Sequence, residues 1–413
     1  TLVRCNFKVT LEDGSEILLP HSAEPRPFES YFVYDNEIPT LLPILWMFST
    51  QAKSTLPEFS RSITAAVVKP VDSAHVLVFD GARIYDSRSG QKMKFLKGEE
   101  YRGDRTLNIL PEVPRGSTTS GGQAPHVEHI AHGLFKDFGV LAPRVDWFRV
   151  IENNQHTQRL AIQQPNERFL EINDRDPNAN IYKIAYNEPN HYPYLPGRIN
   201  YTKQTNTDEG VEDLYEFFGA INSDDPERRA EALRRFLVVE EVMGYSVAGV
   251  LMSNWDGFFN NMFLVHNPLP IDRWECVPWD LDKTFGYTDR DHMFVEMPLE
   301  FPLNGNARRA SREPGPVSRP FHMDPVFHQE YLKRVREGLD GLFSRERVSS
   351  LMEQIERVLL DDLELLEQHT GRRGDSRRDQ IIQSYNTMET FMRLRHEYLR
   401  AHLPTPVEEW SLY

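Results

Sequence analysis

Residues 253–261 read SNWDGFFNN and residues 274–286 read WECVPWDLDKTFG, and these two polar stretches organise the rest of the chain. Between them, Met262–Val265 and Asp272–Val277 are short apolar or mixed runs, separated by the segment Asn267–Pro270, which reads NPLP. This pattern is typical of two strands joined by a turn. Because a hairpin returns its two ends to the same place, we expect the two polar stretches to meet.

The residue types in these stretches suit metal-dependent phosphoryl transfer. In kinases, a catalytic-loop Asp accepts the proton of the substrate hydroxyl, an Asn further along holds Mg²⁺, and a second Asp beyond a hairpin bridges metal and phosphates. Here Asn261 follows Asp256 by five positions, and Asp280 or Asp282 supplies the second carboxylate. Such residues suit Mg²⁺, which prefers oxygen ligands. The His-Arg pair of ordinary kinases is absent, because Asn254-Trp255 stands before the Asp.

The run NWDGFFNN, followed after the expected hairpin by VPWDLDKTFG, resembles the signature of the CotH family of atypical protein kinases. The similarity extends from about Val76 to about Leu403, and PWDLDKTFG is its most specific part. The resemblance implies an α+β fold of the protein-kinase-like bilobal type, with a strand-rich N-lobe and a mainly helical C-lobe. It also implies phosphorylation of protein Ser or Thr with ATP and a divalent metal, Mg²⁺ or Mn²⁺. The family is spread across bacteria and some fungi, so a spore-coat role does not follow from it.

The resemblance also indicates cofactor-binding residues. Relatives carry a similar Lys-x-Lys-aromatic run where Lys92 and Lys94 share one face of an expected strand, so one of these lysines is the candidate for pairing with the nucleotide phosphates. A solvated edge strand is the alternative, because lysine is common there. Glu128, on an expected helix from Pro125 to Phe138, is the candidate partner of that lysine, with a solvent-facing role as the alternative. Lys183 belongs to a Tyr-Lys pair like that of the family and either reaches the nucleotide or forms only a salt bridge.

The catalytic and metal-binding candidates lie in the two polar stretches. We expect Asp256 to position and deprotonate the acceptor hydroxyl, although an ordinary turn residue would also fit. Asn261, or its neighbour Asn260, and Asp280 are the candidates for holding Mg²⁺. Asp282 is either a second metal ligand or a turn residue, and the spacing alone does not choose between the two aspartates.

The hydrophobic pattern predicts strands early in the chain and helices late. Strands are expected over residues 3–9, 63–68, 75–79, 82–85, 145–151 and 159–164, with Asp80-Gly81 as a tight hairpin signal. The family resemblance implies a further strand over residues 107–110. Helices are expected over 125–138, 210–220, 226–251, 325–342, 345–369 and 375–402. Residues 116–122 and 191–207 are predicted loops. Residues 287–320, which include Ser311 in a basic context, correspond in position to a kinase activation segment.

These elements indicate three regions. Residues 1–65 form an N-terminal extension that we expect to pack on the N-lobe. Residues 66–185 form the kinase-like N-lobe, and residues 186–413 form the C-lobe with the active site and the C-terminal helices. A chain of 413 residues, 39% hydrophobic and 26% charged, is long enough for two such lobes.

The amino-acid composition limits the classes of partner that the protein is expected to bind. A net charge of −15 makes nucleic acid or an anionic membrane an unexpected partner, whereas a protein substrate, basic or serine-rich, fits. Two cysteines cannot make a disulfide framework, and no apolar run is long enough for a transmembrane segment. The chain starts at Thr1, as a mature or excised portion would. The expected localisation is that of a protein exported from a bacterium or held at its cell surface. The oligomeric state stays open.

Two other functions compete with protein phosphorylation. One is a different ATP-using transferase on the same fold, which moves AMP or forms an amide. The other is a catalytically inactive surface or coat binding module, because the glycine- and arginine-rich turn of the family is shortened here to residues 86–90. Without the resemblance, the residues would support metal-dependent hydrolysis nearly as well, and paired carboxylates would also fit a glycosidase.

Overall fold

The computed structural model describes residues 2–20, 29–33, 38–48, 60–68, 76–87, 90–112, 125–152, 155–193, 199–267, 272–287, 315–371 and 375–404. The chain divides into two compact units. The first comprises Thr1–Gly116, Val145–Gln164 and Glu356–Ile381, and the second comprises Ser117–Arg144, Pro165–Ile355 and Ile382–Tyr413. Strands dominate the first unit and helices the second, so the predicted α+β class is confirmed. The predicted extents of the regions stay a prediction.

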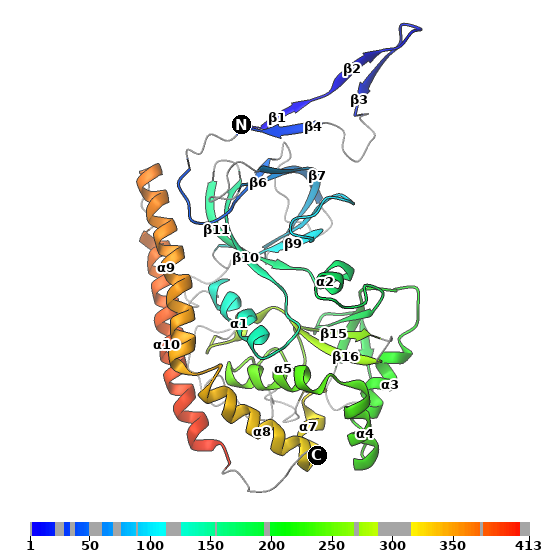
Figure 1. The fold of residues 1–413 in the computed structure, drawn as a ribbon, viewed down its shortest axis with the longest axis vertical. Coiled ribbons are helices and arrows are strands. Elements are labelled where there is room, and N and C mark those ends of the chain that lie inside the picture. The colour runs from blue at the N-terminus through cyan, green and yellow to red at the C-terminus, as the bar shows by residue number, and fades with distance from the viewer. Residues whose placement is uncertain are drawn as a thin grey trace. The chain divides into compact units, whose positions relative to one another are not determined.

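A closed barrel forms the core of the first unit (Figure 1). Its strands are β5 (Ile44–Phe48), β6 (Ser60–Val68), β7 (Val76–Ser87), β8 (Gly90–Lys94), β9 (Thr106–Ile109), β10 (Val145–Glu152) and β11 (Gln155–Gln163). They follow the order β10-β11-β9-β8-β7-β6-β5, and the parallel pair β10–β5 closes an otherwise antiparallel barrel. Inward-pointing apolar side chains fill it, among them the fully buried Ile84, Met93 and Phe148.

The dipeptide Asp80-Gly81 forms a β-bulge, so the tight hairpin predicted there is wrong. β7 runs through this dipeptide and pairs with β6 on both sides of it, with Ile63 opposite Ala82 and Ala65 opposite Phe79. Two residues of β7 therefore lie opposite one residue of β6. Gly81 has a φ of +70°, which glycine adopts without steric cost, and such a glycine occurs in bulges as well as in hairpin turns.

Two short antiparallel ribbons precede the barrel. β1 (Leu2–Cys5) pairs with β4 (Glu29–Phe32), and β2 (Phe7–Thr10) pairs with β3 (Glu16–Leu19). The strand predicted over residues 3–9 is therefore two strands, interrupted at Asn6. β4 also contacts β7 of the barrel.

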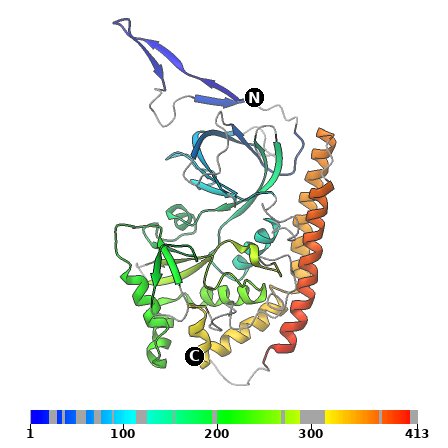
Figure 2. The same cartoon turned by 180° about the vertical axis from the view of Figure 1, so that it is seen from behind.

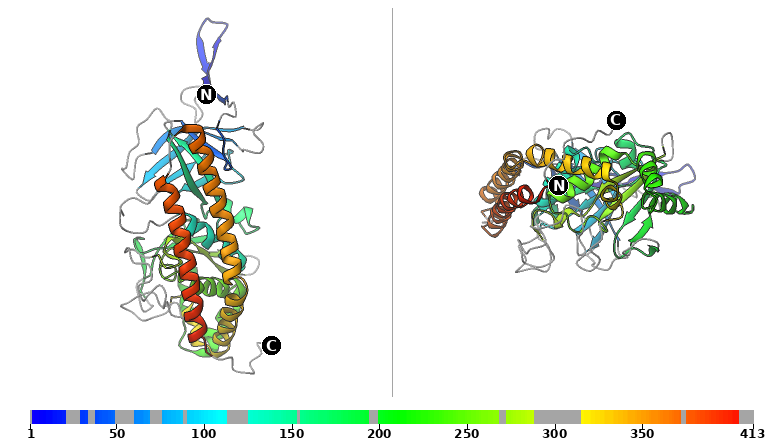
Figure 3. Two further views of the ribbon diagram at one scale, coloured as in Figure 1. Left: turned by 90° about the vertical axis from the view of Figure 1, so that its left-hand side faces the viewer. Right: turned by 90° about the horizontal axis from the view of Figure 1, so that it is seen from below.

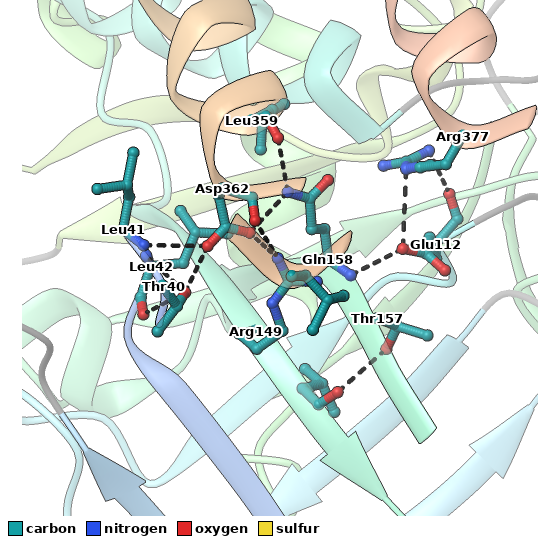
Figure 4. A network of polar contacts seen from close by, with 12 residues as sticks. Thr40, Leu41, Leu42, Glu112, Arg149, Thr157, Gln158, Leu359, Asp362 and Arg377 are labelled. Carbon is teal, nitrogen blue, oxygen red and sulfur yellow. Dashed lines mark hydrogen bonds and ion pairs between the residues drawn. The ribbon is translucent and has the colours of Figure 1, made fainter. Parts of the chain in front are cut away.

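A buried polar network joins the barrel to a helical segment of the same unit (Figure 4). Arg149 of β10 and Asp362 of α9 (Arg345–Thr370) form an ion pair and are 1% and 0% exposed. The Asp362 carboxylate also accepts hydrogen bonds from the Gln158 amide at 2.7 Å and from the Leu41 backbone N–H at 3.0 Å. The Thr40 hydroxyl donates to the same carboxylate. This sharing compensates the two opposite charges, whose burial without a partner would be costly.

The second unit contains an antiparallel sheet of five described strands. They are β12 (Asn180–Ile184), β13 (Asn190–Tyr192), β14 (Ile199–Lys203), β15 (Met262–Asn267) and β16 (Arg273–Pro278). Their order is β13-β14-β12-β15-β16. The predicted loop over residues 191–207 is therefore wrong, because β14 lies within it. Backbone pairing with β12 forms the strand, although residues 191–207 as a whole are rich in Pro, Tyr and Asn.

Helices surround this sheet. They are α1 (Pro125–Asp137), α2 (Glu167–Ile172), α3 (Glu212–Ile221), α4 (Pro226–Phe236), α5 (Val239–Leu251), α7 (Arg319–Met323) and α8 (Pro325–Asp340). α5 contacts both β16 and α8, and α4 also contacts β16. Figure 2 shows the same ribbon from behind. α9 and α10 (Asp375–His402) contribute residues to both units and run side by side (Figure 3).

The single helix predicted over residues 226–251 is wrong, because α4 and α5 are separate helices. Asp225 and Pro226 begin α4 as predicted, with the Asp225 carboxylate accepting from the Glu227 N–H at 2.9 Å. The break lies at Leu237-Val238, where the backbone bridges Trp274 of β16. This long-range pairing diverts the chain at a point that no Gly or Pro marks. The predicted loop at 116–122 and residues 288–314 of the activation-segment prediction lie outside the described residues.

Candidate active site

The β15–β16 hairpin brings the two polar stretches together, as the sequence predicted. Met262 pairs with Pro278, so the first stretch enters β15 where the second leaves β16. The next residue, Trp279, donates its backbone N–H to the carbonyl oxygen of Asn261 at 3.1 Å. At the far end of the second stretch, the Phe285 N–H donates to the carbonyl oxygen of Met252 at 2.9 Å. Backbone hydrogen bonds therefore join the second stretch to the last residue of the first stretch and to the residue that immediately precedes the first stretch.

Buried hydrogen bonds fix the loop that carries Asp256. The chain reaches this loop through α5, whose second half is buried. The Asn254 N–H donates to the Gly249 carbonyl at 2.7 Å, which turns the chain at the helix end. The Tyr245 hydroxyl of α5 donates to the carbonyl oxygen of Gly257 at 2.5 Å. Asp256 thus lies in a turn held from the helix by contacts on both sides of it.

Two asparagine amides orient the Asp256 carboxylate. Its Oδ2 accepts hydrogen bonds from Asn260 Nδ2 at 3.2 Å and from Asn261 Nδ2 at 3.1 Å. Asn260 also accepts a bond from the Tyr186 backbone N–H through Oδ1 at 2.8 Å, so both ends of its amide are engaged. Within the described residues, Oδ1 of Asn261 accepts no hydrogen bond. Of the two asparagines, Asn261 is therefore the one with an oxygen available to a metal ion.

Three carboxylates lie around the turn that begins the second stretch. Asp280 is exposed and adopts a left-handed conformation, with φ 53° and ψ 61°, which Asp tolerates better than most residues. Asp282 is half-buried in the 3₁₀ turn η1 (Leu281–Lys283). The Leu281 N–H donates to Oε2 of Glu128 at 3.2 Å, which fastens α1 to this turn. Glu128, predicted as a partner of the strand lysine, thus lies next to the candidate metal ligands.

Mutual repulsion and burial perturb these carboxylates. Burial raises the pKa of Glu128 well above its usual value, and Asp280 and Asp282 raise it further. Burial and the charge of Asp280, with a smaller effect of Asp256, raise the pKa of Asp282 to about 7. The effect of Asp256 on Asp282 means that the two stretches interact electrostatically across the hairpin. Such an arrangement favours a bound cation, which stabilises the ionised carboxylates.

The donor set fits Mg²⁺ bound together with a nucleotide. Among the described residues, no group of three or more His, Cys, Asp or Glu side chains is arranged to hold a metal ion by itself. A kinase-type Mg²⁺ needs less from the protein, because one or two carboxylates with an amide oxygen, phosphates and water complete its coordination. Oδ1 of Asp282 is buried and has no hydrogen-bond partner among the described residues, which leaves it open to a cation.

The three candidate lysines occupy different surroundings. Lys183 forms an ion pair of 2.7 Å with Glu188, which agrees with its salt-bridge alternative. Lys92 is half-buried on β8, whereas Lys94 is exposed and holds its ammonium 5.8 Å from the centre of the Tyr85 ring. Lys92 and Lys94 belong to the first unit, and the other candidates belong to the second. The pairing of one of these lysines with Glu128 stays a prediction.

Sequence reasoning missed three groups at this site. Lys283 is buried with its Nζ 3.4 Å from Oδ2 of Asp282. The Leu281 backbone N–H and the Tyr245 hydroxyl are the other two, and both make the bonds described above. The position of Lys283 directly after the second aspartate of the motif was a signal in the sequence. Nothing in the sequence indicated the other two, because a backbone donor and a distant helix position carry no motif.

Comparisons with known proteins place the chain in a family. No curated protein sequence matches it. Among solved structures, the proinflammatory kinase CtkA of Helicobacter pylori is similar, with 8% sequence identity and a TM-score of 0.34 over 78% of this chain and 95% of that chain. This likeness is too weak to carry an argument. Residues 127–399, which are more than half of the chain, match the family described as CotH kinase protein. This match supports a kinase-like function, and the chain belongs to the CotH kinase family.

Proposed function

We propose that the protein transfers a phosphoryl group from ATP to a Ser or Thr of a protein substrate and requires Mg²⁺ or Mn²⁺. The observation that carries this proposal is the convergence of Asp256, Asn261, Asp280 and Asp282 across one hairpin, in the order of a kinase active site. Family membership supports the same class of reaction.

Asp256 is the proposed catalytic residue. The two asparagine amides hold its carboxylate in one orientation through Oδ2, and in this orientation the carboxylate would accept the proton of the acceptor hydroxyl. Proton removal makes the hydroxyl oxygen a better nucleophile toward the γ-phosphorus of ATP. The proton passes to Asp256, and ADP leaves with the electron pair of the broken P–O bond.

Asn261, Asp280 and Asp282 are the proposed metal ligands. The bound ion would neutralise charge on the phosphates and orient them. The hydrogen bond from the Tyr186 N–H commits Asn260 to the protein, so Asn260 takes part as an orienter of Asp256 and not as a ligand. Asp280 is exposed to an incoming ion, and Asp282 presents an unpartnered oxygen.

Lys92 and Lys94 are the proposed nucleotide-binding lysines, with Glu128 as the acidic residue that fixes the one in use. Lys183 has Glu188 as its partner and is therefore a weaker candidate for nucleotide contact. A basic or serine-rich protein fits the acidic chain as acceptor. In the part of the chain that the structure describes, no helix is both long and apolar enough to cross a bilayer.

Mass spectrometry of the products formed from ATP, Mg²⁺ and candidate acceptor proteins tests the reaction type. Phosphorylation adds the mass of one phosphoryl group to a Ser- or Thr-containing peptide. A nucleotide adduct on the acceptor would instead identify an AMP transferase, and a new amide bond would identify a ligase-type reaction. Absence of any metal-dependent ATP binding would favour an inactive binding module.

A further inference from the structure

Lys283 is a buried cation inside the cluster of carboxylates. Its side chain is 8% exposed, and its Nζ lies 3.4 Å from Oδ2 of the adjacent Asp282. A buried ammonium is strongly disfavoured unless a carboxylate compensates its charge. The short turn η1 places Lys283 and Asp282 side by side at no cost in long-range chain entropy. This lysine therefore belongs to the charge balance of the site.

The electrostatic effect of Lys283 on Glu128 also indicates that this lysine belongs to the charge balance of the site. Burial raises the pKa of Glu128 most, Asp280 and Asp282 raise it further, and Lys283 opposes that rise. Lys283 thus acts on two carboxylates that come from different elements, α1 and η1. Lys283 thereby offsets part of the repulsion among the three carboxylates.

The two oxygens of Asp282 have different roles. Oδ2 faces the Lys283 ammonium, whereas Oδ1 is buried without a hydrogen-bond partner among the described residues. A buried carboxylate oxygen without a partner is costly, so such an oxygen calls for a ligand. Because the Lys283 ammonium lies beside Oδ2, it does not block the position beside Oδ1 where a metal ion would bind.

Backbone bonds hold the turn that carries the pair. The Thr284 hydroxyl donates to the Leu281 carbonyl oxygen at 2.8 Å, and the Leu281 N–H donates to Glu128. The Phe285 N–H donates to the carbonyl oxygen of Met252, the residue that precedes the first stretch. Lys283 therefore acts on Asp282 from a fixed backbone position, as residues behind metal ligands commonly do.

We propose that Lys283 is a positioning residue of the phosphoryl-transfer site, which fixes the Asp282 carboxylate through Oδ2 so that Oδ1 is presented to the divalent metal ion. This inference rests on the proposed function. It differs from a simple charge-neutralising role, because it requires Lys283 to act through Asp282.

Calorimetric titration of Mn²⁺ into the full chain with a saturating non-hydrolysable ATP analogue tests the inference. We expect Lys283→Met to weaken Mn²⁺ binding by about tenfold or more, as loss of an outer-shell partner commonly does. The affinity for the analogue without metal should not change. Lys283→Arg keeps the positive charge and should recover most of the affinity. Lys333→Met, which removes an exposed lysine of α8, is the matched control and should bind Mn²⁺ as wild type does.

The Asp282→Asn background separates positioning from a general structural effect. If Lys283 acts through Asp282, adding Lys283→Met to Asp282→Asn causes no further loss of Mn²⁺ affinity. Additive losses, or Mn²⁺ affinity in Lys283→Met equal to or above that of wild type, overturn the inference. If Lys283→Met does not fold, Lys283→Gln replaces it in the same design.

The outcomes also separate this inference from the proposed function. If wild type binds Mn²⁺ with the analogue and Lys283→Met binds it equally well, only the role of Lys283 is wrong. If wild type binds neither Mn²⁺ nor the analogue, the proposed function and the role of Lys283 are both wrong.

Discussion

The backbone N–H of Trp279 donates a 3.1 Å hydrogen bond to the carbonyl oxygen of Asn261. This bond joins the residue that ends the first polar stretch to the residue that precedes Asp280. It places Asp256, the proposed catalytic residue, and Asp280, a proposed metal ligand, at the same end of one hairpin, although 24 positions separate them in the sequence. The proposed chemistry depends on this closure.

Substitution Asp256→Asn should abolish most of the transfer activity. Asn cannot take the proton of the acceptor hydroxyl, so kcat should fall by about 10²- to 10⁴-fold. The melting temperature should stay close to that of wild type, because an amide oxygen at this position still accepts from Asn260 and Asn261. Transfer of labelled phosphate from ATP measures the effect. Asp208→Asn, at an exposed position, is the control, and wild-type activity in Asp256→Asn would disprove the assignment.

Lys92 and Lys94 should differ in their effect on nucleotide binding. Lys94 is exposed and lies over the Tyr85 ring, whereas Lys92 is half-buried on the same face of β8. We therefore expect Lys92→Met to weaken ATP binding by about tenfold or more, which corresponds to a loss of about 1.4 kcal/mol of binding free energy. Lys94→Met should change the affinity for ATP little. Fluorescence titration with a labelled ATP analogue compares the two. The reverse order would move the assignment to Lys94, and no effect of either would remove both.

Breaking the Arg149–Asp362 pair should destabilise the barrel unit. Asp362→Ala leaves the Arg149 guanidinium buried without its carboxylate and removes the acceptor of Gln158 and Thr40 (Figure 4). Loss of one partner of a buried pair costs about 3–5 kcal/mol of unfolding free energy. Urea unfolding followed by circular dichroism measures it. The double variant Arg149→Met/Asp362→Leu should be more stable than Asp362→Ala, and equal stability of the two would contradict the account.

The pair of Asp213 and His266 makes the stability of the second unit depend on pH. His266 donates to Asp213 at 2.7 Å and to Asp272 at 2.9 Å. Burial alone would lower the pKa of His266, but these two hydrogen bonds outweigh it and raise the pKa. Burial raises the pKa of Asp213, but its bonds with His266, Tyr182 and Asn180 lower it overall, to about 2. The stabilisation that protonated His266 gives to the folded chain is therefore complete below the unfolded-state pKa of histidine, near 6.5. It is lost as the pH rises through the higher pKa that His266 has in the folded chain.

The contribution of Asp213 to stability has the opposite pH dependence. It is complete above the unfolded pKa of Asp, near 4, and is lost as the pH falls toward about 2. Both contributions are present between about pH 4 and pH 6.5. Urea unfolding at pH 6.0 and pH 8.5 should show that His266→Gln costs about 2 kcal/mol at pH 6.0 and less at pH 8.5. A cost that is the same at both pH values would mean that the charge of His266 contributes nothing.

Local sequence patterns predicted the parts of the fold that depend on local chemistry. The helix from Pro125 and the N-cap at Asp225 follow from periodicity and capping, and the β15–β16 hairpin follows from the NPLP turn. The bulge at Asp80-Gly81 was mistaken for a turn, because both use a glycine with positive φ. The break between α4 and α5 was missed, because it depends on pairing of Leu237 with Trp274 and not on the residues at the break.

At the candidate site, too, local sequence patterns could not reveal contacts between residues that lie far apart in the sequence. Asp256, Asn261, Asp280 and Asp282 were found because a motif and a hairpin place them together. The choice between Asn260 and Asn261 needed the hydrogen bond from the Tyr186 N–H, which no spacing predicts. The contact of Glu128 with the Leu281 N–H likewise depends on how α1 packs against η1, far apart in the sequence.

The most direct test of the central claim is the melting temperature of wild type and Asp280→Ala with and without ATP plus Mg²⁺. A ligand at about a hundred times its Kd stabilises the folded chain by about 2.7 kcal/mol, which is readily measured. We predict that Mg²⁺ with ATP raises the melting temperature of wild type, that ATP without metal raises it less, and that Asp280→Ala loses the metal-dependent part. Absence of any shift in wild type, or an undiminished metal-dependent shift in Asp280→Ala, would contradict the proposed site.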